Sequence, residues 1–85
     1  MTPEQSRAAR GWLGWSQREL AKRANVSLST VHEFEIGQRT PIANNIAAMR
    51  RAIESAGVRL VFDRKGGAGI LRQDADPDLF NEVHS

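Results

Sequence analysis

Four side chains with complementary chemistry stand close together near the middle of the chain: Leu28, Ser29, His32 and Glu33. At about 100° per residue they fall on one side of a helix, opposite the apolar positions Val31 and Phe34. A hydroxyl donates or accepts a hydrogen bond, a carboxylate accepts one, and leucine offers an apolar surface. Such a set suits base edges, because serine bonds several bases, glutamate accepts from cytosine N4, and leucine packs on a thymine methyl.

Taken singly, each of these residues is as easily explained as an ordinary exposed side chain. Together they are better explained as a recognition surface, since all of them face outward from one helix. Histidine could contact either a base or a phosphate, more readily when protonated. We therefore predict base contacts from Leu28, Ser29, His32 and Glu33.

The helix that carries this set has its own start and stop signals. Ser27 is a good N-cap residue, and Gly37 supplies the left-handed position that follows a helix end. We predict a helix over about residues 28–36, with Val31 and Phe34 facing the core.

A second helix is predicted just before it, over about residues 17–24. Ser16 with Glu19 three residues on has the spacing of a capping box, in which each residue bonds the backbone amide of the other. Asn25 ends the helix, because asparagine tolerates left-handed geometry. Two separately bounded helices joined by a turn of about three residues form a helix-turn-helix.

This stretch resembles the phage-repressor/Cro-type helix-turn-helix regulators, the XRE-like (Cro/C1-type) family, over about half of the chain. The matching residues are Gln17, Leu20, Ala21, Val26, Ser27 and the segment from Val31 to Gly37. Asn25 departs from the glycine usual in the family. The resemblance implies a mainly α, lambda-repressor-like fold of four to five short helices, with a C-terminal β-hairpin or strand used for dimerisation. It also implies base contacts at the positions of Leu28, Ser29 and Glu33.

Arg10 has two interpretations. It is either a solvated surface arginine or the partner of Glu35 in an ion pair that ties the first helix to the end of the recognition helix. The resemblance favours the structural ion pair of Arg10 with Glu35, because phage repressors carry such a bridge at these two positions.

Contacts to the sugar-phosphate backbone are predicted around the recognition helix. Gln17 begins a helix, where amide donors and the positive end of the helix dipole suit a phosphate. The loop after the recognition helix lies on the DNA backbone in the family. The predicted phosphate-contacting residues are Gln17, Arg18, Ser27, Thr30, Gln38, Arg39 and Thr40.

Two further helices are expected to close the core. The first begins after the N-cap Thr2, runs to about Leu13, and turns Ala9, Leu13 and Trp12 toward one side. The other starts between Pro41 and Asn45, with Asn44 as the favoured cap, and ends at Gly57. Its core stripe is Ile46, Met49 and Ile53.

After Gly57 the apolar period changes to two, which predicts a strand with Val58, Leu60 and Phe62 on one face. Residues 64–69 read as a turn before a returning strand at 70–72. An isolated hairpin is only marginally stable in water, so we predict that it pairs with a second copy. The predicted dimer interface comprises Val58, Leu60, Phe62, Ile70 and Leu71.

Three segments are expected: residues 1–57 as the helix-turn-helix domain, 58–72 as the dimerisation hairpin and 73–85 as an acidic tail. Residues 1–72 carry a net charge of +6 and the tail carries −4, so a basic body suits a polyanion. The tail is either disordered or a short helix after Pro77, and it could bind a protein partner.

Composition argues against other classes of protein. The chain has no cysteine and no run of about 18 apolar residues, so thiolate metal sites and a membrane span are not expected. Its two histidines, His32 and His84, belong to no cluster that would indicate an enzyme, a metal or a cofactor. The leading expectation is a cytoplasmic, nucleoid-associated repressor that binds double-stranded DNA as a homodimer. The alternative is an antitoxin-type protein whose C-terminal region binds a toxin while it autoregulates its operon.

Overall fold

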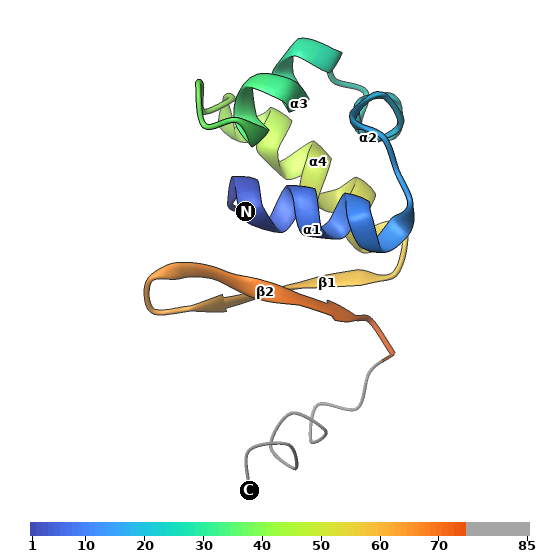
Figure 1. The fold of residues 1–85 in the computed structure, drawn as a ribbon, viewed down its shortest axis with the longest axis vertical. Helices are drawn as coiled ribbons and strands as arrows, with labels where there is room; N and C mark the ends of the chain where they lie inside the picture. Colours follow the sequence, from blue (N-terminus) through green and yellow to red (C-terminus); the bar gives the residue numbers. More distant parts are fainter. Residues whose placement is uncertain (75–85) are drawn as a thin grey trace, which may run out of the picture.

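The computed structural model describes residues 1–74, which form four helices followed by a two-stranded antiparallel sheet (Figure 1). The helices are α1 (Pro3–Leu13), α2 (Gln17–Ala24), α3 (Leu28–Glu35) and α4 (Ala43–Ser55). The strands are β1 (Val58–Asp63) and β2 (Gly66–Arg72). The predicted mainly α fold with a C-terminal hairpin is confirmed. The two interpretations of the tail concern residues 75–85, which lie outside the described part of the chain.

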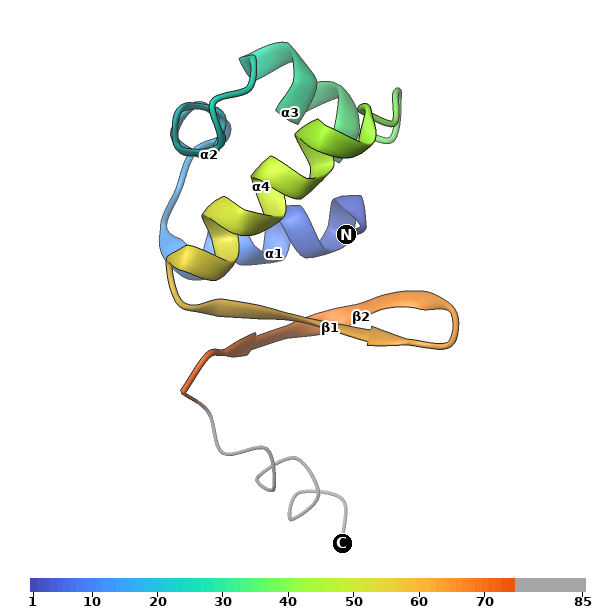
Figure 2. The same ribbon diagram turned by 180° about the vertical axis from the view of Figure 1, so that it is seen from behind.

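The elements are stacked so that α1 lies between α3 and the hairpin, and the two opposite views agree on this order (Figures 1 and 2). One side of α3 therefore points away from the rest of the protein, on the side opposite the hairpin. Within residues 1–74, no helix is long and apolar enough to cross a membrane.

A single apolar core joins all four helices to β1. The predicted stripe of α4 is present, with Met49 and Ile53 fully buried and Ile46 half-buried against them. The buried apolar side chains are Ala9, Leu20, Ala21, Ala24, Val31, Phe34, Met49, Ile53, Val58 and Leu60. Because β1 contributes two of them, the hairpin completes the core of the helices.

Two predictions for the helices were wrong. Trp12 is 61% exposed, since α1 turns Ala9 and not Trp12 into the core. α4 starts at Ala43 with Ile42 as N-cap, two residues earlier than an Asn44 cap would place it, and no side chain caps it. The carbonyl of Ile42 accepts from the amides of Asn45 and Ile46 at 3.0 and 3.2 Å, so the extended residue after Pro41 begins the helix through its backbone alone.

The predicted turn at residues 64–69 is shorter than expected. Strand β2 begins at Gly66, and only Arg64 and Lys65 connect the strands. The register shifts between Val61 and Phe62, where Ala68 of β2 has no partner on β1. Phe62 is 42% exposed and lies against the Arg50 guanidinium at 4.8 Å instead of joining the core. A β-bulge of this kind locally disrupts the hydrogen-bond ladder and bends the strand that carries the extra residue.

Candidate nucleic-acid interface

Both ends of α2 and the start of α3 are defined by the two N-cap serines and the left-handed asparagine that the sequence indicated. Asn25 adopts left-handed geometry at φ 56° and closes α2. Ser16 and Ser27 are the N-caps, and their hydroxyls each accept from the amide three residues on at 3.0 Å. The capping box at Ser16 is only half made, because the Glu19 carboxylate accepts instead from Arg23 Nε at 2.9 Å. The result is a helix-turn-helix in which the first turn of each helix is capped.

The side of α3 that faces away from the core carries the predicted base-contacting set. Val31 and Phe34 are 0% and 4% exposed, whereas Leu28 is 38% exposed. Ser29 and His32 are exposed as well, and the Glu33 side chain is half-buried beside the loop that follows α3. The four side chains are thus positioned on one accessible surface, which we call the α3 outer face: Leu28, Ser29, His32 and Glu33.

The loop after α3 brings a cation to this face. Arg39 Nε lies 3.7 Å from Glu33 Oε2, and the backbone amides of Gln38 and Arg39 both donate to the Glu33 carbonyl, at 2.9 and 3.2 Å. One hollow at the base of the helix is lined by residues from both predicted sets, namely Thr30, Glu33, Arg39 and Thr40, together with Asn45. The fold therefore places base-directed and phosphate-directed groups side by side.

The remaining residues predicted to contact phosphate differ in their exposure and in the hydrogen bonds that they already make. Arg18 and Gln38 are exposed. The Ser27 hydroxyl is exposed but already caps α3 and pairs with Thr30 Oγ1 at 2.8 Å. Gln17 is half-buried, and its amide group bonds other protein side chains, so its side chain is committed inside the protein.

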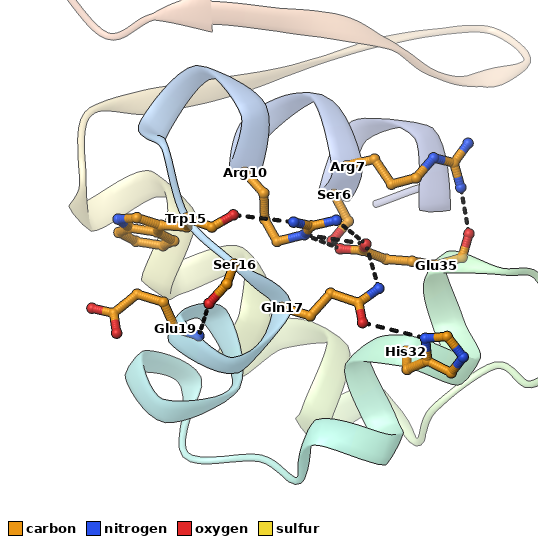
Figure 3. Close-up of polar contacts among 9 residues, drawn as sticks. All are labelled: Ser6, Arg7, Arg10, Trp15, Ser16, Gln17, Glu19, His32 and Glu35. Carbon is orange, nitrogen blue, oxygen red and sulfur yellow. Dashed lines mark hydrogen bonds and ion pairs between the residues drawn. The ribbon is translucent and has the colours of Figure 1, made fainter.

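Arg10 and Glu35 pair within a buried polar cluster (Figure 3). Arg10 Nη2 lies 2.6 Å from Glu35 Oε1, and Arg10 Nε lies 2.8 Å from Glu35 Oε2, so the contact is bidentate. Ser6 donates to the same carboxylate at 2.6 Å and Gln17 donates at 3.1 Å. Arg7 donates to the Glu35 backbone carbonyl. Glu35, which is 1% exposed, thus joins α1, α2 and α3 at one carboxylate.

The electrostatics of the cluster favour the ionised pair. Burial by itself would raise the pKa of the Glu35 carboxyl, but hydrogen bonds from Arg10, Ser6 and Gln17, with the charge of Arg10, lower it below its ordinary value. The bond to Glu35 raises the pKa of Arg10 in return. Among the described residues, no buried side-chain nitrogen or oxygen is left without a hydrogen-bond partner. The cluster therefore anchors the C-terminal end of α3 as a fully satisfied network.

The predicted dimer residues divide into two groups. Val58 and Leu60 are 1% and 5% exposed in the core of their own chain, so their assignment to an interface with a second chain was wrong. Alternation correctly placed both on the apolar face of β1, but α4 covers that face. Phe62, Ile70 and Leu71 retain accessible surface, and Ile70 and Leu71 line an apolar hollow with Trp12.

Three residues of the site were missed from the sequence. Ser6 lies one turn before Arg10 on α1, so its spacing of four could have indicated that both reach the same partner. Arg7 donates to the last carbonyl of α3, and no local pattern announces that contact. Asn45, in the first turn of α4, lines the hollow beside α3, and no pattern in the sequence indicated that contact.

Residues 1–74 contain no group of three or more histidine, cysteine or carboxylate side chains placed to hold a metal ion. A sequence model described as helix-turn-helix matches residues 7–54, which covers more than half of the chain and includes α2, α3 and most of α1 and α4. No curated protein has a sequence that matches this one significantly. With two capped helices across a left-handed asparagine and an accessible α3 outer face, the chain belongs to the XRE-like, Cro/C1-type helix-turn-helix family of DNA-binding transcription regulators.

Proposed function

We propose that this regulator is a repressor that binds a palindromic operator as a homodimer, with α3 in the major groove. One observation carries the proposal: Leu28, Ser29 and His32 are exposed on the helix whose opposite side, Val31 and Phe34, is buried in the core. The major groove admits one α-helix, and the first residues of that helix reach the base edges. Repression needs only that the bound protein occupies a promoter, and such a regulator would act at the nucleoid in the cytoplasm.

Phosphate contacts from the loop after α3 would hold the helix in register. Gln38 and Arg39 are exposed in the loop that follows α3, and Arg18 is exposed at the start of α2. Within residues 1–74 the Thr40 amide donates to no protein acceptor, so it is free to donate to a phosphate oxygen. Contacts of this kind position a protein on DNA without reading its sequence. For Gln17, Ser27 and Thr30 we propose at most a secondary role, because their side chains already bond within the protein.

The position of the hairpin limits how two chains can pair. Since α1 separates α3 from the hairpin, stacking two hairpins face to face would point the two α3 helices in opposite directions (Figures 1 and 2). Pairing along a strand edge would keep both on one side, as two successive major grooves about 34 Å apart require. We propose the edge of β2, because the apolar hollow of Trp12, Ile70 and Leu71 adjoins it. Phe62 on β1 is a further candidate residue for the dimer interface.

Selection of bound sequences from random DNA duplexes at two salt concentrations tests this function. Two half-sites with twofold symmetry support dimeric reading, and the double variant Leu28→Ala/Ser29→Ala should lose the consensus while it keeps salt-dependent binding. If binding by the wild-type chain depends steeply on salt but no sequence is enriched, the protein binds only the sugar-phosphate backbone of DNA, and the proposal is wrong.

The antitoxin alternative depends on the C-terminal tail, most of which lies outside the described residues. Its support is compositional: residues 73–85 are acidic and contain the apolar Leu79, Phe80 and Val83. Deletion of residues 75–85 separates the two functions. A regulator alone keeps its operator binding and loses no partner, whereas an antitoxin keeps its operator binding and loses a co-purifying toxin.

A further inference from the structure

The side chain of Gln17 connects the buried cluster to the α3 outer face (Figure 3). Its Nε2 lies 3.1 Å from Glu35 Oε1, and its Oε1 lies 3.2 Å from His32 Nδ1. The Glu35 carboxylate is buried against the Arg10 guanidinium and ionised, so it can only accept hydrogen bonds. The amide nitrogen of Gln17 must therefore face Glu35, because the reverse orientation would place two acceptor oxygens against each other. The chemistry of the two hydrogen-bond partners is therefore sufficient to fix the orientation of the Gln17 amide.

The orientation of Gln17 determines the hydrogen-bonding state of His32. An amide oxygen is only an acceptor, so His32 Nδ1 must donate to it. In a neutral imidazole only one ring nitrogen carries a proton, and the other is an acceptor. Neutral His32 thus carries its proton on Nδ1 and has its lone pair on Nε2.

The free ring nitrogen lies on the surface that would enter the groove. His32 is exposed on α3, in the same outward set as Ser29 and Glu33. With Nδ1 turned toward Gln17, the second ring nitrogen points away from the buried cluster (Figure 3). In the major groove the hydrogen-bond donors are the exocyclic amino groups, N4 of cytosine and N6 of adenine, whereas guanine and thymine present acceptors at O6, N7 and O4.

We propose that His32 is a specificity-determining residue whose Nε2 accepts a hydrogen bond from cytosine N4 or adenine N6, and that Gln17 is the positioning residue that fixes this polarity. The inference rests on the proposed function, because it needs α3 in the major groove. Gln17 then has a different role from the predicted phosphate contact. Its amide nitrogen donates to Glu35, so its amide oxygen faces His32, and this leaves His32 Nε2 as an acceptor on the α3 outer face.

The first experiment needs no DNA. Correlation spectra of the imidazole ring nitrogens and carbons of the full chain, recorded at about pH 8.5 where free imidazole is neutral, distinguish the two neutral tautomers. The spectrum of a His84→Asn variant identifies the signals of His32. We expect the Nδ1-protonated form in the wild type and a shift toward the Nε2-protonated form in Gln17→Met, which keeps the side-chain length but removes both hydrogen bonds. A wild-type His32 that is mainly Nε2-protonated overturns the inference, whatever the protein binds.

The second experiment repeats the duplex selection with wild type, His32→Ala and Gln17→Met, after thermal melts have shown that the variants fold. We expect one position per half-site to prefer adenine or cytosine on the strand read, and His32→Ala to reduce that preference about tenfold while the other positions keep theirs. A consensus that His32→Ala leaves unchanged overturns the inference but leaves the proposed function standing. If the wild type enriches no sequence, the proposed function fails and the reading role of His32 fails with it.

Discussion

The amide of Gln5 occupies the space beside Gly67 that any larger residue would need. A Cβ built on Gly67 would lie 2.5 Å from Gln5 Oε1 and 2.6 Å from Thr2 Cγ2. The Gln5 oxygen accepts from the Thr2 amide at 3.0 Å, and its nitrogen donates to the carbonyls of Val61 and Gly69 at 2.8 and 3.0 Å. One side chain therefore caps α1 and binds both strands beside the register shift, which makes the hairpin part of the helical body.

Replacing Gly67 with alanine should destabilise the protein by about 1–3 kcal/mol, because the new methyl group displaces a side chain that three hydrogen bonds hold in place. Gly69→Ala is the matched control, since a Cβ there has no atom within 4 Å. Urea unfolding of both variants measures the difference. Equal stability of the two variants would show that Gln5 can move aside freely.

Arg10→Ala should lower the free energy of unfolding by about 3–5 kcal/mol, since it leaves the buried Glu35 carboxylate without its charged partner. Arg72→Ala, which breaks the exposed pair with Asp74, should cost less than about 1 kcal/mol. Denaturant titrations of the two variants test the contrast. A loss below about half a kcal/mol in Arg10→Ala would mean that the pair adds little to the stability of the fold.

The lowered pKa of Glu35 predicts a specific acid sensitivity. A carboxyl with a depressed folded-state pKa stabilises the fold fully above its unfolded value, here about 4.5, and that contribution is lost as pH falls through the lower folded value. The wild type should therefore lose stability on acidification below about pH 4.5 more steeply than Glu35→Gln, which has no proton to take up. Unfolding free energies measured across this range should converge at low pH, and parallel curves would contradict the assignment.

Base-directed and phosphate-directed residues should respond differently to substitution. Ser29→Ala should relax the preference at one position of each half-site and cost about 1–3 kcal/mol on the best site. Arg39→Ala should weaken binding to all duplexes about equally and reduce the salt slope by about 1. Affinities for a consensus and a scrambled duplex at several salt concentrations separate the two. A uniform loss in Ser29→Ala would remove it from the base-contacting set.

Two apolar residues of the hairpin should give opposite phenotypes. Leu71→Lys places a charge beside the proposed β2 edge and should convert the dimer to a monomer. The melting temperature of that monomer should equal the melting temperature of the wild-type monomer. Val58→Ala removes buried apolar volume and should cost about 0.5–1.5 kcal/mol or more of stability without changing the dimer. Sedimentation equilibrium and thermal melts measure both. A Leu71→Lys protein that remains a dimer would exclude this edge as the interface.

Helix caps depend on residues that are close together in the chain, so the sequence alone predicts them well. Ser16, Ser27 and Asn25 act on backbone groups within four residues of themselves, so their types and spacing sufficed to predict both ends of α2 and the start of α3. The predictions of Trp12 on the core side of α1 and of Asn44 as the N-cap of α4 were wrong, because the buried face of a helix and its first residue depend on what packs against it. The register shift beside Phe62 is likewise a property of the pairing between two strands, which the residue pattern of β1 alone does not show.

The sequence by itself determined that two capped helices are joined by a tight turn and which side of α3 is apolar. Its composition indicated that the basic residues 1–72 suit a polyanion and, because the chain has no cysteine, that thiolate metal sites are not expected. These features depend on neighbours in the chain, so composition and period reveal them. Only the tertiary structure decided that Val58 and Leu60 are core, that Gln5 needs Gly67, and that Glu35 orients Gln17 toward His32. Each of these depends on groups brought together from separate elements, and no local pattern encodes their distance.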